Sequence, residues 1–391
     1  MIRNEVAAWL QLLQAEGVGN DAARRLLAAF GLPEQVLAQS LVALEQVVSA
    51  RQATALRQIQ AQTQTLIETT WQWLQQDDPA IQRRLFVLGD PDYPSLLLEM
   101  ADPPLMLYAM GQVDRLHHVQ PRIAMVGSRN PTPQGASNAR AFACSFAEWG
   151  WTVVSGLGLG VDGAAHEGAL LAGVHGDLGL PTIAVVGTGL DRVYPRQHRE
   201  LAHRIAQQGV ILSECALGTP PLAHHFPKRN RIIAGLSHGV LVVEAALQSG
   251  SLITARLAAE QGKEVFAIPG SIHAQQSRGC HALIRQGAKL VESAQDVAEE
   301  LQHVVPGIEE MPATGSGAAP QEETTSTDGS AHGKETVFLL QALGHDPVGL
   351  DALLERTGLN AATLQARLLE LELTGVVGRL PGGLFQRIGR G

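Results

Sequence analysis

The sequence predicts an α/β protein: a Rossmann-like doubly wound, mostly parallel sheet, with an N-terminal helical domain and a C-terminal winged-helix domain. Three observations lead to this fold class. Between residues 121 and 301, short apolar segments without polar alternation each precede a helical segment, which is typical of parallel strands covered on both faces. Residues 1–80 show helical apolar spacing. Residues 334–391 run through three helical segments into a hairpin, the order of a winged helix.

The composition is that of a globular protein with a large core. The chain has 391 residues, enough for roughly two or three domains. Cys144, Cys215 and Cys280 lie far apart with no Cys-x-x-Cys pair, which argues against a disulfide framework or a zinc site. The N-terminus lacks the features of a signal peptide, and no segment is apolar enough to span a bilayer. We therefore expect a cytoplasmic protein with no membrane contact.

The net charge of −9 is spread unevenly along the chain. Residues 121–301 carry 15 Lys and Arg against 14 Asp and Glu, so most of the acidity lies outside this segment. The charge of the whole chain therefore does not exclude a polyanionic ligand, because a local basic patch decides such binding. It does argue against strong nonspecific binding to duplex DNA.

The helical domain is expected over residues 1–80, with its first two helices at 5–15 and 21–30. The turn Gly17-Val18-Gly19 between them resembles a helix-hairpin-helix, whose backbone N–H groups can meet a phosphate. The flanks carry as many acids as bases, so a plain helix connection is favoured and the domain is predicted to be a scaffold or accessory. The Pro-rich stretch that follows, Phe86 to Gly111, is expected to supply two edge strands.

The Rossmann-like domain is expected over residues 81–301. Its strands are predicted at 123–126, 152–155, 182–186, 210–213, 240–243 and 265–268, and its helices at 134–149, 162–171, 198–208, 229–235 and 254–261. Ligands of such sheets lie beyond the carboxyl ends of the strands. The stretches of interest all fall at such ends: Gly127-Ser128-Arg129, Ser155 to Gly160, Gly187 to Asp191, Phe226 to Arg231, and Ser249 to Thr254.

The first of these stretches, Gly127-Ser128-Arg129, ends an apolar strand and offers a closely approachable backbone beside a guanidinium, which suits a phosphate. Nucleotide motifs are missing. Gly156, Gly158 and Gly160 alternate, so the Gly-x-Gly-x-x-Gly spacing fails, and no phosphate-binding Gly-x-x-x-x-Gly-Lys-Ser/Thr run is present. A nicotinamide or ATP-hydrolysing function is therefore disfavoured.

Metal chemistry also lacks support. Asp162, Asp191, Glu214 and Glu244 are dispersed over different strand ends, and Asp162 and Glu244 suit helix capping or loop pinning better than a two-metal site. His166 and the pair His224-His225 have no partner at ligand spacing. We expect no metal site.

The run from Phe226 to Arg231 places three cations, an amide and an aromatic ring just before an apolar helix. Cations at the start of a helix oppose its dipole unless an anion binds there. Guanidinium and ammonium groups on phosphates, with a ring on a base, are the contacts that single-stranded nucleic acid requires. This run predicts a single-stranded nucleic-acid site.

An ordered set of motifs across about 190 residues resembles the DprA/Smf DNA-processing family. The matching stretches include Tyr93-Pro94, 102–108, 126–129, 155–162, Ala165-His166, 189–191, Tyr194-Pro195, Ser213-Glu214, 226–234, Val243-Glu244, 249–255, Pro269-Gly270 and Gly279-Cys280. The resemblance implies a protein of natural transformation that binds and protects incoming single-stranded DNA and helps load the RecA recombinase. It also implies a homodimer formed through the Rossmann-like domain, no cofactor and no enzymatic activity.

Carried over from the family, Arg129 would clamp a phosphate and Lys228 would hold a neighbouring one. Ser128 and the glycines at 127, 156 and 158 would supply backbone donors. Three departures from the family bear on loop shape: His198 and His281 replace Asn, Gly158 replaces Ala, and residues 171–181 resemble an insertion. The expected nucleic-acid-binding residues are Gly127, Ser128, Arg129, Ser155, Gly156, Gly158, Phe226, Lys228, Arg229, Asn230 and Arg231.

The C-terminal part is expected as a flexible acidic linker over residues 302–333 and a winged-helix domain over 334–391. The linker carries few large apolar residues, so it cannot bury enough surface to order itself. The expected recognition helix, 360–373, offers Arg367 as its cation beside two glutamates. We expect a protein-contact or regulatory role for this domain, or weak duplex contact.

Two other classes of function stay open. One is a nucleotide-binding enzyme of the lysine-decarboxylase-like (phosphoribohydrolase) Rossmann superfamily, although its Pro-Gly-Gly-x-Gly-Thr loop is replaced here by Gln248-Ser-Gly-Ser-Leu-Ile-Thr254. Release of base from AMP would support it. The other is an adaptor that binds proteins through its acidic ends, which would leave Arg129 and Lys228 without a role.

Overall fold

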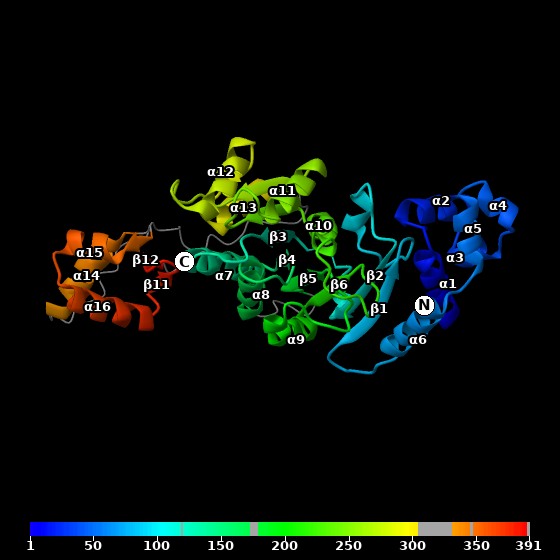
Figure 1. The fold of residues 1–391 in the computed structure, drawn as a ribbon, viewed down its shortest axis with the longest axis horizontal. Coiled ribbons are helices and arrows are strands. Elements are labelled where there is room, and N and C mark those ends of the chain that lie inside the picture. Colours follow the sequence, from blue (N-terminus) through cyan, green and yellow to red (C-terminus); the bar gives the residue numbers. More distant parts are fainter. Residues whose placement is uncertain (119, 173–178, 304–330, 345–346, 389–391) are drawn as a thin grey trace.

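The computed structural model describes residues 1–391 apart from 119, 173–178, 304–330, 345–346 and 389–391. The helical domain, the sheet domain and the small C-terminal domain follow one another along the longest axis of the molecule (Figure 1). Most of the predicted linker therefore lies outside the described residues, as does the middle of the predicted insertion.

The N-terminal helical domain contains α1 (Arg3–Gln14), α2 (Asn20–Phe30), α3 (Pro33–Ala38), α4 (Leu41–Glu45), α5 (Ala50–Arg57) and α6 (Ala61–Leu74). The predicted first two helices and the tight turn between them are confirmed. In that turn Gly17 has φ +77° and its carbonyl accepts a hydrogen bond from Gln52 Nε2 at 2.7 Å. This bond ties the α1–α2 turn to α5.

The central sheet has nine strands in the order β1-β2-β6-β5-β4-β3-β7-β8-β9. The pairs β1–β2 and β2–β6 are antiparallel, and the other pairs are parallel, which confirms the mostly parallel doubly wound fold. Of the two edge strands predicted for the Pro-rich stretch, the second is a strand, β2, but it lies between β1 and β6 rather than at the edge; the first is wrong, because Ser95–Glu99 forms a 3₁₀ helix and the edge strand β1 lies mostly before the stretch. The strands are β1 (Gln82–Val87), β2 (Met106–Gly111), β3 (Arg122–Val126), β4 (Thr152–Ser155), β5 (Thr182–Val186), β6 (Val210–Ser213), β7 (Gly239–Val242), β8 (Glu264–Ala267) and β9 (Lys289–Leu290).

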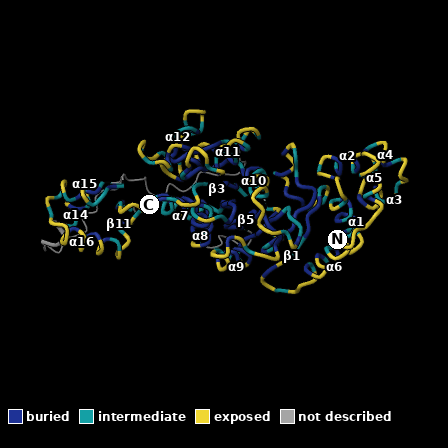
Figure 2. The backbone as a smooth tube through the Cα atoms, in the orientation of Figure 1, coloured by how far each residue is buried: buried dark blue, intermediate teal, exposed yellow. Residues whose placement is uncertain are grey.

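Helices cover both faces of this sheet, as the continuous apolar strands require. Alternate residues of β3 show the two faces: Ile123 and Met125 pack against α7, α8 and α13, whereas Ala124 and Val126 share a core with α10, α11 and α12. The sheet strands are buried along most of their length (Figure 2). The helices are α7 (Pro133–Glu148), α8 (Val161–Leu171), α9 (Arg199–Gln208), α10 (His225–Gly235), α11 (Ser251–Glu260), α12 (Arg278–Arg285) and α13 (Ala294–Leu301).

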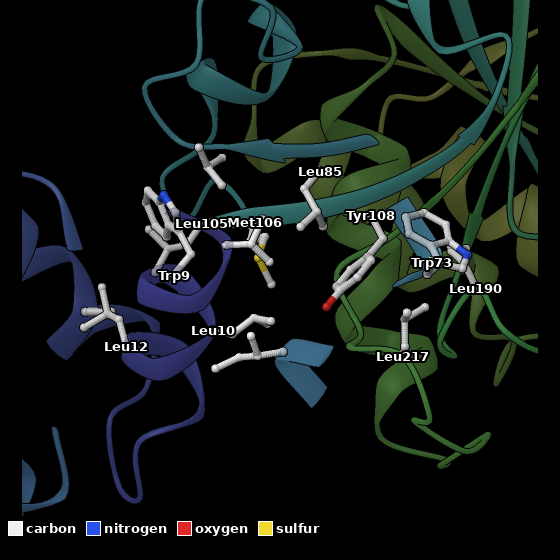
Figure 3. Packing of buried hydrophobic residues seen from close by; sticks show 14 of the residues in the cluster. Trp9, Leu10, Leu12, Trp73, Leu85, Leu105, Met106, Tyr108, Leu190 and Leu217 are labelled. Atoms are coloured by element: carbon white, nitrogen blue, oxygen red, sulfur yellow. The ribbon is translucent and has the colours of Figure 1, made fainter. Parts of the chain in front are cut away.

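The helical domain and the sheet share one hydrophobic core. Leu10 of α1 and Trp73 of α6 belong to the same buried cluster as Met106 and Tyr108 of β2 (Figure 3). The rings of Trp73 and Tyr108 lie 5.8 Å apart, and the Tyr108 hydroxyl is 3.2 Å from Thr70 Oγ1. The helical domain is therefore packed onto the sheet rather than tethered to it. The domain boundaries predicted from the sequence remain predictions.

The C-terminal domain is a winged helix, as predicted. It contains α14 (Ala331–Leu343), α15 (Leu350–Thr357) and α16 (Ala361–Leu373), with a small sheet of β10 (Val348–Gly349), β12 (Leu384–Arg387) and β11 (Val377–Leu380). Gly358, in the left-handed region at φ +66°, ends α15, and the Asn360 side chain caps α16 by accepting from the Thr363 N–H. Strand β11 lies against the start of α7, where a Cβ on Gly378 would be 2.6 Å from Pro133 Cγ. In the part of the chain that the structure describes, no helix is long and apolar enough to cross a membrane.

Candidate nucleic-acid interface

A groove lies where the strand order reverses. Strand β3 pairs with β4 on one side and β7 on the other, so the loops that leave the carboxyl ends of these strands diverge and leave a crevice. The crevice has a volume of 690 Å³. It is lined by Val126, Gly127, Arg129, Gly156, Gly158, Leu159, Asp162, Tyr194, Pro195, Pro221, Ala223, Phe226, Pro227, Arg229, Asn230, Ile233, Ser249, Gly250, Ser251 and Thr254.

Three helices begin at this groove: α8 at Val161, α10 at His225 and α11 at Ser251. The first turn of a helix carries the positive end of the helix dipole. The first N–H groups of these helices donate within the protein, Val161 to the Ser128 carbonyl, His225 to the Leu222 carbonyl and Ser251 to Ser249 Oγ, so the dipoles rather than free N–H groups remain to attract a ligand. The convergence of three helix dipoles favours an anion in the groove, and the carboxylate of Asp162, in the first turn of α8, acts against it.

The loop after β3 brings Gly127 and Arg129 to the groove. A Cβ on Gly127 would lie 2.6 Å from Val161 Cγ2 and 2.9 Å from the Glu244 carbonyl oxygen, so only glycine fits. Arg129 is exposed, with its Cζ 5.8 Å from the centre of the Phe226 ring. The prediction that this loop presents a guanidinium at the rim is thus compatible with its place in the fold.

Several backbone and hydroxyl groups expected to face DNA are occupied within the protein. The Ser128 N–H donates to the Glu244 carbonyl at 2.7 Å, and the Gly158 N–H donates to Asp162 Oδ2 at 3.1 Å. Neither N–H group is free in this structure, and their role as backbone donors to phosphate stays a prediction. Ser155 has 0% exposure and its Oγ donates to the Met125 carbonyl at 2.6 Å, so the structure gives no support to the prediction that Ser155 contacts DNA.

The basic run lies inside α10 rather than before it, which corrects the predicted helix start at residue 229. The helix begins at His225, so the run occupies its first two turns and its side chains point in different directions at about 100° per residue. Phe226, Arg229, Asn230 and Ile233, spaced three and four residues apart, line the groove. The run therefore does not act as a single basic patch.

Arg231 and Lys228 lie on other faces of α10. Arg231 Nη2 is 2.5 Å from Glu214 Oε1 and Nη1 donates to the Asp102 carbonyl, leaving the side chain 11% exposed. Arg231 joins α10 to the loops after β6 and before β2, so the structure gives no support to the prediction that Arg231 contacts DNA. Lys228 Nζ is 3.6 Å from Glu214 Oε2 but its side chain is 53% exposed, so it stays available to a phosphate beyond the groove.

Arg229 points inward and binds the backbone at the bottom of the groove, at Gly156 and Val185. Its Nη1 donates to the carbonyls of Gly156, at 2.5 Å, and of Val185. A Cβ on Gly156 would lie 2.3 Å from that nitrogen, so glycine makes room for the guanidinium. Burial raises the pKa of Asp162, while the nearby Arg229 and the Gly158 N–H act in the opposite direction. Arg229 therefore has two roles: it holds together the carboxyl ends of β4 and β5, and it adds a positive charge to the groove.

The remaining strand-end carboxylates hold loops in place. Glu244 accepts from both the backbone N–H and the hydroxyl of Thr132, and Asp191 Oδ1 accepts from the Gly218 N–H at 2.8 Å. The prediction that Asp162 and Glu244 pin loops is confirmed by these bonds and by the Gly158 bond described above. Within the described residues, no group of three His, Cys, Asp or Glu side chains is placed to hold a metal ion.

Two groove elements were missed among the expected site residues. Tyr194 is 46% exposed and its ring lies 5.6 Å from the Phe226 ring. The start of α11, Ser249 to Thr254, was placed at a strand end but assigned no contact; it forms the wall that follows β7. The sequence feature that could have identified Tyr194 is an aromatic residue in a loop at a strand end. Its neighbour in space, Phe226, is 32 residues away in the chain, so the sequence does not show that the two rings meet.

This fold and site define a class: modular Rossmann-like proteins in which three helix starts and an arginine surround a groove at the point where the strand order reverses. The chain belongs to the DprA/Smf family within that class. The family model for DNA recombination-mediator protein A matches residues 84–302, and the model for the DprA winged helix domain matches residues 320–383.

Relatives and solved structures agree with this assignment. Protein Smf of Escherichia coli is 38% identical over 98% of this chain and 96% of its own length. DNA processing protein DprA of Streptococcus pneumoniae is 47% identical over 56% of this chain and 74% of its own length. The X-ray structure of DprA from Streptococcus pneumoniae superposes with a TM-score of 0.64 at 38% identity, covering 75% of this chain and 97% of that one. A Helicobacter pylori DprA structure, described in terms of its single-stranded DNA binding mode, gives a TM-score of 0.51 at 31% identity, covering 57% of this chain and 97% of that one.

Proposed function

We propose that this protein binds single-stranded DNA in the groove at the carboxyl ends of β3, β4 and β7. The observation that carries the proposal is the exposed Arg129 guanidinium over the Phe226 ring, at the point where three helices begin. Arg129 and the helix starts suit phosphates, and the ring suits an unpaired base. A member of the same family, from Helicobacter pylori, is described as binding single-stranded DNA, which supports the choice of ligand.

Single strands are favoured over duplex for two reasons. A base can stack on Phe226 only if it is unpaired and turned out of a helix. The chain also has a net charge of −9, and only a few cations reach the groove, so it lacks the basic surface that duplex backbones require.

The family assignment supports a wider role. We propose that the protein acts in the cytoplasm during natural transformation, protects incoming single-stranded DNA and helps load RecA onto it, as a homodimer through the Rossmann-like domain. Binding rather than catalysis, with no cofactor, fits the strand-end carboxylates, because Asp162, Asp191, Glu214 and Glu244 are each engaged in hydrogen bonds or ion pairs within the protein.

The test is a titration of fluorescent oligo-dT and of a matched duplex across a salt series. We expect tighter binding of the single strand, with a log–log salt slope of about −0.7 per phosphate contact. Equal affinity for both nucleic acids would contradict the proposal. Release of base from AMP, measured in parallel, would instead support the phosphoribohydrolase class.

A further inference from the structure

Tyr194 is an exposed aromatic residue on a loop that the rest of the protein holds still. The loop connects β5 to α9. Leu190 is buried, Asp191 accepts from the Gly218 N–H at 2.8 Å, and His198 Nδ1 is 3.0 Å from the Leu157 carbonyl oxygen. These contacts fix both sides of the loop, so Tyr194 is presented to the groove with little freedom to move.

The Tyr194 ring has few structural contacts of its own. It is 46% exposed, and the ring interaction that the structure records for it is with Phe226, at 5.6 Å and an interplanar angle of 40°. Among the residues that the structure describes, its hydroxyl has no hydrogen-bond partner. A large aromatic side chain that is held in place, exposed and directed along a groove is better suited to contact a ligand than to stabilise the fold.

The groove combines a guanidinium with apolar surface. Arg129 lies over Phe226, and the apolar residues Leu159 and Pro195 line the same groove as Tyr194. An unpaired nucleotide strand has a matching combination, with charged phosphates on one side and flat bases on the other. Because Tyr194 and Phe226 are neighbours, two successive bases can each meet a ring while the phosphate between or beside them faces Arg129.

We propose that Tyr194 is a second base-stacking platform, so that the groove engages the bases of at least two successive nucleotides. This inference rests on the proposed function and deepens it. It makes the strand's bases, and not only its phosphates, a determinant of affinity at this site.

The experiment compares Tyr194→Ala, Tyr194→Leu and Tyr194→Phe in the full chain. The ligands are oligo-dT and an oligonucleotide of equal length whose sugars carry no bases. For Tyr194→Ala and Tyr194→Leu we expect about 5- to 140-fold weaker binding of oligo-dT, the equivalent of ~1–3 kcal/mol per stacked base. Tyr194→Phe should bind as the wild type does, because it keeps the ring. All three variants should keep the wild-type salt slope, since no phosphate contact is lost.

The base-free oligonucleotide separates stacking from a structural effect. The wild type and Tyr194→Ala should bind it equally, because this ligand offers no base to stack on the Tyr194 ring. An equal loss on both ligands, or a Tyr194→Leu variant that binds oligo-dT normally, overturns the inference and leaves the proposed function intact as long as the wild type prefers single strands. A wild type that binds no oligonucleotide overturns both.

Discussion

Substitution of Arg129 by alanine is the most direct way to count phosphates at the groove. The side chain is exposed and, within the described part of the chain, makes no ion pair; its recorded contact is the Phe226 ring at 5.8 Å. The free energy of unfolding should therefore change by no more than ~0.5 kcal/mol. Any change in affinity then reports on the ligand and not on the fold.

The size of the effect follows from counterion release. Each phosphate contact on a single strand adds about 0.7 to the magnitude of the log–log salt slope. If Arg129 holds one phosphate, the slope of Arg129→Ala is shallower by about 0.7. The ratio of the variant Kd to the wild-type Kd should then fall about fivefold for a tenfold rise in salt.

The assay is fluorescence anisotropy with oligo-dT from 50 to 500 mM KCl. Arg140→Ala is the matched control, because Arg140 is also an exposed arginine but pairs with Glu167 on the α7–α8 face and does not line the groove. Its salt slope should equal that of the wild type. Parallel lines for Arg129→Ala and the wild type would refute the assignment of a phosphate to Arg129, whatever the change in absolute affinity.

Two further predictions concern the groove floor and a buried histidine. Gly156→Ala places a Cβ 2.3 Å from Arg229 Nη1, so the guanidinium must leave the Gly156 and Val185 carbonyls; urea unfolding should show a loss of about 1–3 kcal/mol together with weaker oligo-dT binding. Gly19→Ala, where the added Cβ meets no atom within 4 Å, should cost well under ~1 kcal/mol, and equal losses would contradict the reasoning. Burial lowers the pKa of His166 to about 3. Below the ordinary histidine pKa of ~6.5, His166 is therefore protonated in the unfolded chain but stays neutral in the folded one. Stability should fall as the pH drops from ~6.5 towards that value, and the urea-unfolding profile of His166→Gln should be shallower by up to ~1.4 kcal/mol per pH unit in this window, whereas parallel profiles would exclude His166 as a source of the pH dependence.

The sequence predicted the strands, and the loops at their carboxyl ends, well, because both depend on local patterns. Continuous apolar segments such as 182–186 have one plausible place in an α/β protein, and the strand-end rule then located the groove. Gly127 and Arg129 could be identified in this way because a short loop fixes their position directly after a buried strand.

The sequence could not predict in which direction each side chain of the basic run, Phe226 to Arg231, points. The sequence predicts a helix from residue 229, but the helix begins at His225, and its turn directs Arg229 inward and Arg231 towards Glu214. Glu214 and Asp102, which hold Arg231, come from distant parts of the chain, so no local pattern could reveal them. Tyr194 was missed for the same reason, since its partnership with Phe226 exists only in three dimensions.

Because the helical domain and the sheet share one core, the chain should not tolerate truncation between them. A fragment that begins near residue 80 would leave Met106 and Tyr108 of β2 facing water, although they are 4% and 0% exposed in the intact protein. It would also strip the Tyr108 hydroxyl of its neighbour Thr70. Such a fragment should aggregate on expression, and its failure to bind an oligonucleotide would say nothing about whether the helical domain touches DNA.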